Sequence, residues 1–118
     1  MLFTLIDDQK LITGALEILI KEIYGDVEIL TFNSAQSFLD ALDKGIRPDI
    51  VFIDIIMPEI NGIKLIEICK KKYKNKTKLI ALSSLRDIST IKNVLNLGVD
   101  GYLSKDIIPD ELKLAIDE

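Results

Sequence analysis

The chain has 118 residues, of which 48% are hydrophobic and 29% are charged, and this suits one compact domain that buries a core. The net charge of −4 argues against nucleic acid as a primary ligand. The absence of histidine excludes a phosphohistidine donor, a histidine zinc site and a Ser-His-Asp hydrolase, and the single cysteine excludes an internal disulfide. No apolar run approaches the length of a membrane span and no signal peptide opens the sequence, so we expect a cytoplasmic protein without membrane contact.

Strand and helix patterns alternate five times along the chain. Short apolar runs indicate the strands, and apolar residues three or four positions apart indicate the helices. The continuous run from Ile50 to Ile53 predicts a strand that is buried on both faces of a sheet. Strands are expected at residues 2–6, 27–31, 49–53, 79–82 and 101–103. Helices are expected at residues 10–24, 34–44, 63–73 and 88–97, with a last helix near Pro109.

Helix boundaries are marked by residues with known positional preferences. Ser34 suits the N-cap of the second helix, and Pro109 suits the first turn of the last one. Gly25, Gly45 and Gly98 each follow the end of a helical pattern, where glycine is favoured.

This regular (βα)5 alternation predicts one α/β domain over residues 1–118. Right-handed crossovers place helices on both faces of a parallel sheet and leave few strand orders. We expect the flavodoxin-like three-layer sandwich with strand order 2-1-3-4-5. In that order the first, third, fourth and fifth strands are neighbours, so their carboxyl ends share one crevice.

Polar side chains follow these four neighbouring strands. They are Asp7, Asp8, Asp54, Ser83 and Lys105. The crowded carboxylates should repel one another and raise the pKa of at least one, and a hard cation such as Mg²⁺ would relieve that repulsion. The carboxylate of Asp54 can attack phosphorus to give an acyl phosphate. Lys105 would contribute a positive charge beside the phosphoryl group and Ser83 a hydrogen bond to it.

Each of these residues also has a plain structural interpretation. Asp7 and Asp8 could cap the first helix, Asp54 could belong to a turn, and Lys105 could be a solvated surface lysine. Ser83 and Ser84 could cap the fourth helix, a role for which Asp87 competes. For two other features the structural interpretation is preferred. Cys69 is expected in the core, and the lysines between residues 70 and 78 are expected to form a solvated helix end.

The same residues resemble the receiver domain of two-component response regulators, and the resemblance covers essentially the whole chain. They match in order and in position at the strand ends. The matching residues are the acidic pair Asp7-Asp8, the phospho-acceptor Asp54 with Met57, Pro58 and Gly62 in its loop, the switch residues Ser83 and Tyr102, and Lys105-Asp106 with Pro109. A joint match of this kind is far more specific than any one motif.

The resemblance implies a phosphorylation-operated signalling switch and not a metabolic enzyme. It implies Mg²⁺-dependent transfer from the phosphohistidine of a sensor histidine kinase to Asp54, with Asp7, Asp8, Asp54 and the backbone carbonyl of Ile56 as metal ligands. Ser83 and Tyr102 would change position together and alter a signalling surface. Ile56 and Leu85 would flank the path of the attacking water, and both are apolar, so we expect slow self-dephosphorylation.

The segments 98–106 and 109–112 resemble, more specifically, receivers that are joined to a LuxR-type helix-turn-helix. We therefore expect control of a DNA-binding output, with DNA contacted only through an output domain that this chain does not contain, and the resemblance allows a homodimer on phosphorylation.

Two alternatives come from other classes. One is a small flavodoxin-like enzyme or cofactor binder, such as an aspartate-nucleophile phosphatase, although the second aspartate typical of those phosphatases is here Ile56. The other is a phosphorylation-independent pseudo-receiver that acts as a binding module.

Overall fold

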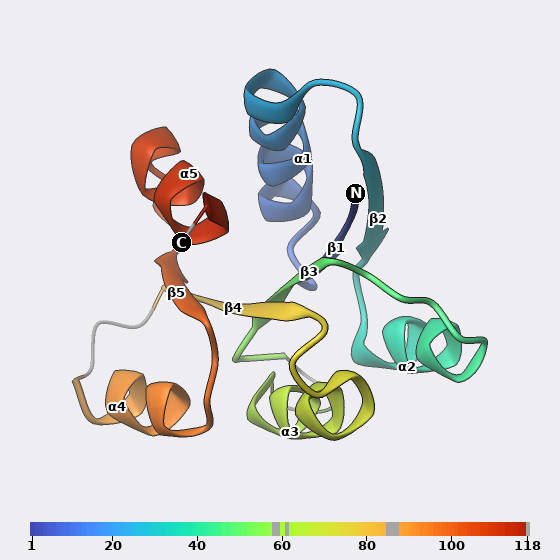
Figure 1. Cartoon of the computed structure of the whole chain (residues 1–118). Helices are drawn as coiled ribbons and strands as arrows, with labels where there is room; N and C mark the ends of the chain where they lie inside the picture. Colours follow the sequence, from blue (N-terminus) through green and yellow to red (C-terminus); the bar gives the residue numbers. More distant parts are fainter. Residues whose placement is uncertain (58–59, 61, 85–87, 118) are drawn as a thin grey trace.

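The computed structural model describes residues 1–57, 60, 62–84 and 88–117. Strands and helices alternate from one end to the other, as the sequence predicts (Figure 1). The strands are β1 (Leu2–Ile6), β2 (Glu28–Phe32), β3 (Ile50–Asp54), β4 (Lys78–Ser83) and β5 (Gly101–Ser104). The helices are α1 (Lys10–Tyr24), α2 (Ala35–Asp43), α3 (Gly62–Tyr73), α4 (Ile88–Asn96) and α5 (Pro109–Asp117).

The five strands form one parallel sheet in the order β2-β1-β3-β4-β5, which confirms the predicted flavodoxin-like order. Helices α1 and α5 cover one face of the sheet, and α2, α3 and α4 cover the other (Figure 1). Because all strands run the same way, their carboxyl ends lie along one edge, as a crevice-forming α/β sheet requires.

Alternating side chains of the strands build two cores, one under each helical layer. In β3, Ile50 and Phe52 pack toward α1 and α5, whereas Val51 and Ile53 pack toward the other three helices. All four are buried, as the continuous apolar run predicts for a strand covered on both faces. The central strand is therefore enclosed by a core on each face of the sheet.

The strand ends differ from the predicted ones by about one residue, and two of these differences concern the site. Asp54 and Ser83 are the last residues of β3 and β4, whereas the sequence placed them just past the strands. The parallel ladder continues to these positions, since Asp54 is paired with Leu82 and the backbone N–H of Ile55 donates to the carbonyl of Leu82 at 3.1 Å. The backbone of both residues is therefore held by sheet pairing.

Two predicted helix boundaries are confirmed. The hydroxyl of Ser34 accepts a hydrogen bond from the backbone N–H of Ser37 at 3.1 Å, so Ser34 is the N-cap of α2. Gly25 ends α1 with a positive φ of 76° and donates its N–H to the carbonyl of Lys21.

The start of α1 corrects the suggestion that Asp7 or Asp8 caps this helix. The N-cap is Gln9, and its side chain accepts no capping hydrogen bond. Asp7 instead accepts the backbone N–H of Gln9 through Oδ1 at 2.8 Å, which orders the turn ahead of the helix. Pro58, Leu85 and Asp87 lie outside the residues that the structure describes, and within the described ranges no helix is long and apolar enough to cross a membrane.

Candidate phosphoacceptor and metal site

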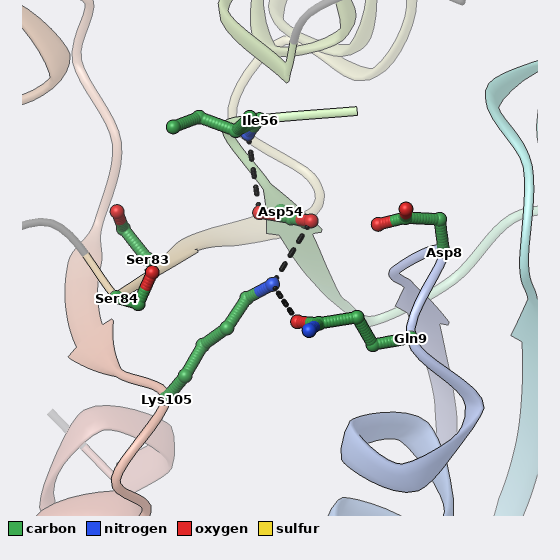
Figure 2. Close-up of a pocket in the computed structure, with 7 residues that line it drawn as sticks. All are labelled: Asp8, Gln9, Asp54, Ile56, Ser83, Ser84 and Lys105. Atoms are coloured by element: carbon green, nitrogen blue, oxygen red, sulfur yellow. Dashed lines mark hydrogen bonds and ion pairs between the residues drawn. The ribbon is translucent and has the colours of Figure 1, made fainter. Parts of the chain in front are cut away.

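A pocket of about 240 Å³ opens at the carboxyl edge of the sheet. The predicted residues Asp8, Asp54, Ile56, Ser83 and Lys105 line it, as Figure 2 shows. Gln9 and Ser84 complete the lining. Residues from four separate strand ends are thus brought to one hollow, which is what the predicted strand order requires.

Three carboxylates lie close together at this edge of the sheet, two of them in the pocket lining and the third, Asp7, buried beside them. Asp7 is fully buried, Asp54 is 1% exposed and Asp8 is exposed. One ligand oxygen from each residue lies within 4.8 Å of the other two. Hard divalent cations prefer oxygen donors of this kind, and Mg²⁺ usually keeps several water ligands on the open side. The donor set therefore fits a magnesium-type cation, with the exposed Asp8 on the solvent side.

Lys105 lies between the carboxylates and pairs with two of them. Its Nζ is 3.0 Å from Asp7 Oδ2 and 3.0 Å from Asp54 Oδ2. It also donates to Gln9 Oε1 at 2.7 Å, and Figure 2 shows the contacts with Asp54 and Gln9. Both carboxylate oxygens are buried, and apart from these ion pairs neither has a hydrogen-bond partner within the described part of the chain. Burial alone would lower the pKa of Lys105, but the hydrogen bonds and charges of Asp7 and Asp54 outweigh it and raise this pKa. The ammonium therefore stays charged.

The pKa of Asp54 is raised from 3.8 to about 6. Burial is the largest cause, and the negative charge of Asp7 adds to it, while the N–H of Ile56 and the ammonium of Lys105 act in the opposite direction. The sequence predicted the direction of this shift but attributed it to repulsion between carboxylates. Desolvation is the larger effect, because Asp54 lies inside the sheet ladder and not in an open loop.

Ile56 fixes one oxygen of Asp54. Its backbone N–H donates to Asp54 Oδ1 at 3.1 Å, so the two carboxylate oxygens have different partners, Ile56 for one and Lys105 for the other. The side chain of Ile56 is 55% exposed although it is apolar. It lines the pocket without offering a hydrogen bond to water there.

Ser83 and Tyr102 lie on adjacent strands, as the sequence predicts. Ser83 is buried at the end of β4 and is paired with Ser104, and Tyr102 is two residues earlier on β5, paired with Ala81. The ring of Tyr102 is half-buried and packs against the core under α2, α3 and α4. The two side chains thus connect the pocket with the face of the sheet that α4 covers.

Two residues of the site were missed by sequence reasoning. Gln9 holds Lys105, and Asn33 donates its side-chain amide to the carbonyl of Asp7 at 2.8 Å and to Thr13 Oγ1 at 3.3 Å. Asn33 follows β2, the edge strand to which no chemical role was assigned. A weak signal for Gln9 existed, since glutamine is an unusual N-cap and Gln9 directly follows the acidic pair.

The structural interpretation preferred for Cys69 holds, and that of the lysines holds in part. Cys69 is fully buried, and burial raises the pKa of its thiol to about 12. Lysines 70, 71 and 72 lie in the last turn of α3, where cations are favoured by the helix dipole. Lys78 is the first residue of β4 and not part of a solvated helix end, since its Nζ donates to the carbonyl of Ile116 in α5 at 2.6 Å.

A parallel (βα)5 sheet with three carboxylates and a lysine at its carboxyl edge defines a flavodoxin-like protein with an acidic cluster that could hold a cation. The chain belongs to the response regulator receiver domain family, whose model matches residues 3–117. The comparison agrees with the resemblance that the motifs carry.

Curated relatives include two regulators of transcription by name. The chain is 30% identical over 113 residues to the transcriptional regulatory protein DegU of Brevibacillus brevis, which covers 95% of this chain and 47% of DegU. It is 31% identical over 101 residues to the DNA-binding transcriptional activator EvgA of Escherichia coli K12, which covers 86% of this chain and 48% of EvgA. The chain thus spans about half the length of these relatives.

Solved structures share the fold over nearly the whole chain. The receiver domain of the Francisella response regulator 1452 has a TM-score of 0.83 at 28% identity and covers 98% of this chain and 93% of its own. The chemotaxis protein CheY4 of Vibrio cholerae has a TM-score of 0.84 at 19% identity and covers 98% of this chain and 95% of its own.

Proposed function

We propose that this receiver accepts a phosphoryl group on Asp54, from the phosphohistidine of a sensor histidine kinase, in a reaction that depends on Mg²⁺. The observation that carries the proposal is the geometry around Asp54. One of its oxygens accepts the N–H of Ile56 at 3.1 Å, the other faces the ammonium of Lys105 at 3.0 Å, and the Asp7 and Asp8 carboxylates lie beside it.

The chemistry is a single displacement at phosphorus. A carboxylate oxygen of Asp54 forms a new O–P bond, the P–N bond to the donor imidazole breaks, and that bond's electron pair stays on the imidazole nitrogen. Lys105 lies on the same side of the pocket as the carboxylate and would pair with the phosphoryl oxygens. Ser83 would give them a hydroxyl hydrogen bond.

Asp7, Asp8, Asp54 and the backbone carbonyl of Ile56 would hold the cation. A cation held there would neutralise negative charge that builds up as the phosphoryl group approaches three carboxylates. The fit rests on the oxygens of the three aspartates, which lie within 4.8 Å of one another, and on the burial of Asp7 and Asp54.

The switching surface is proposed to comprise α4, β5 and α5. A phosphoryl oxygen that draws Ser83 inward would open space beside Tyr102, whose half-buried ring could move into it. We further propose that this surface controls a DNA-binding output of the LuxR type, acting in the cytoplasm, with a homodimer on phosphorylation. The names of DegU and EvgA support control of transcription.

The test is incubation with acetyl phosphate, a small phosphoryl donor, read by intact mass. Wild type should gain the mass of one phosphoryl group with Mg²⁺ and not with a chelator, and Asp54→Ala should gain none. An unmodified wild type, or equal modification of both proteins, would refute the proposal.

A further inference from the structure

Gln9 occupies the N-cap position of α1, but its side chain makes no capping hydrogen bond. Its backbone angles are extended (φ −88°, ψ 104°). Serine, threonine, aspartate and asparagine are the side chains that serve this position well. A residue that does not suit its place in the secondary structure is commonly found there for a functional reason.

The backbone of Gln9 is nevertheless fixed on both sides. Its N–H donates to Asp7 Oδ1 at 2.8 Å, and its carbonyl accepts the N–H of Ile12 at 3.0 Å and that of Thr13 at 3.3 Å. The Cα–Cβ direction of Gln9 is therefore set by the acidic turn and by the first turn of α1. From there its side chain extends across the pocket toward Lys105 (Figure 2).

Gln9 completes the coordination of the Lys105 ammonium. An ammonium has three hydrogens to donate. Among the described residues it makes one hydrogen bond, to Gln9 Oε1 at 2.7 Å, and two ion pairs, with Asp7 Oδ2 and Asp54 Oδ2, each at 3.0 Å. Gln9 gives the shortest of these contacts and is the one neutral partner among them.

From this geometry, and on the basis of the proposed function, we propose that Gln9 is a positioning residue. It holds Lys105 beside Asp54 while the carboxylates of Asp7 and Asp54 bind the cation in place of the ammonium. A divalent cation attracts Asp7 and Asp54 and so weakens their hold on the ammonium. The amide oxygen carries no net charge and competes less for the cation. Gln9 thus keeps the ammonium beside the point at which the phosphoryl group arrives.

The contact can be tested without any phosphoryl donor. In ¹⁵N-labelled wild type, the Lys105 ammonium should give a slowly exchanging Nζ resonance, assigned by its loss in Lys105→Met. Gln9→Met, which keeps the side-chain length and removes the acceptor, should speed its exchange when Mg²⁺ is present. Gln9→Glu keeps an acceptor oxygen and should restore the slow exchange. An unchanged resonance in Gln9→Met would overturn the proposal.

Kinetics test whether the contact matters for phosphorylation. Gln9→Met should slow modification by acetyl phosphate at saturating Mg²⁺ by about three- to tenfold, the effect of losing one typical intramolecular hydrogen bond. The matched control is Gln36→Met, since Gln36 is an exposed glutamine on α2 whose side-chain amide donates to Asp40 of the same helix at 2.9 Å. The control should leave the rate unchanged.

A double-mutant cycle shows whether Gln9 acts through Lys105. In a Lys105→Met background, Gln9→Met should have little further effect, since the ammonium it positions is gone. Equal slowing in both backgrounds would overturn the proposal, because Gln9 would then act independently of Lys105. A wild type that takes no phosphoryl group would refute the function proposed for Asp54, whereas the resonance decides the Gln9 contact by itself.

Discussion

At the scale of single residues, the site combines a buried acceptor with a fixed environment. Asp54 is held by backbone pairing, by the N–H of Ile56 and by Lys105, so its position depends little on loop motion. Desolvation keeps its pKa high, at about 6. The fold thus buries a carboxylate, whose charged form is destabilised by desolvation, at the place where a cation and a phosphoryl group are proposed to bind. Shifted pKa values of this kind are typical of functional sites.

The raised pKa of Asp54 gives a signed prediction for stability without metal. The folded chain binds this proton more tightly than the unfolded chain, so the group's stabilising contribution is complete below the unfolded pKa of 3.8 and is lost as pH rises through about 6. Asp54→Asn should therefore be more stable than wild type at neutral pH with a chelator, and the difference should shrink toward acidic pH. Urea midpoints followed by circular dichroism measure it.

The matched control is Asp26→Asn, an exposed aspartate in the loop between α1 and β2 at the opposite edge of the sheet. It should change the urea midpoint little at any pH. Equal midpoints for Asp54→Asn and wild type at neutral pH would contradict the account of Asp54 as a desolvated carboxylate.

The exposed side chain of Ile56 predicts a long-lived phosphorylated state. It lines the pocket next to Asp54 and offers no hydrogen bond to an attacking water. Ile56→Asn should increase the rate of phosphate loss severalfold, because an amide can orient that water. The rate is measured by intact mass after the donor is removed. Ile18→Asn, at an exposed position on α1, should leave it unchanged, and equal rates for Ile56→Asn and wild type would remove support for this role.

At the scale of elements, the contact between α3 and β3 constrains the acceptor. Gly62, the first residue of α3, is buried, and its N–H donates to the carbonyl of Ile55 at 3.0 Å. A Cβ at this position would overlap the carbonyl oxygen of Asp54 and the Cα of Ile55, and would come within 2.7 Å of the Asp54 carbonyl carbon. Only glycine lets the helix approach the backbone of the acceptor this closely.

Two glycine substitutions should therefore change the free energy of unfolding in opposite directions. Gly62→Ala should destabilise the chain by about 1–3 kcal/mol, because backbone atoms must move to admit the methyl group, and it should slow phosphorylation of Asp54. Gly14→Ala, inside α1 with nothing within 4 Å of the added Cβ, should stabilise the chain by about 0.5–1 kcal/mol. Urea unfolding measures both values. A neutral Gly62→Ala would show that this close approach is not required.

At the scale of the whole molecule, the strand order followed from the alternation of strand and helix and from the burial of the third strand. The chain had few other parallel arrangements available. The strand ends were displaced by about one residue, because ladder hydrogen bonds, and not apolar character, decide where a strand stops. This is why Asp54 and Ser83 proved to be inside their strands.

The location of the site could also be predicted from the sequence, since parallel strand ends must meet at one edge of the sheet. The contacts of Gln9 and Asn33 could not be predicted, because they depend on the directions of side chains in turns. The leading cause of the Asp54 pKa shift was also missed, since desolvation depends on packing that periodicity does not specify. The metal ligands and the switch remain predictions.

The closed double core should protect the thiol of Cys69. This side chain is fully buried, and burial raises the pKa of the thiol to about 12. Labelling with a disulfide reagent should be slow under native conditions and fast beyond the urea midpoint, because reaction requires opening of the core. Moving the thiol two residues along α3 to an exposed position, in Cys69→Ser/Lys71→Cys, should make labelling fast without urea. Rapid labelling of native wild type would contradict a closed core.

The most direct test of the central claim is to locate the phosphoryl group after reaction with acetyl phosphate and Mg²⁺. Borohydride reduces an aspartyl phosphate to homoserine, which tandem mass spectrometry of the digested protein places in the sequence. The account predicts homoserine at position 54 and at no other aspartate. Phosphoserine at Ser83, or homoserine at Asp7 or Asp8 in place of Asp54, would contradict it.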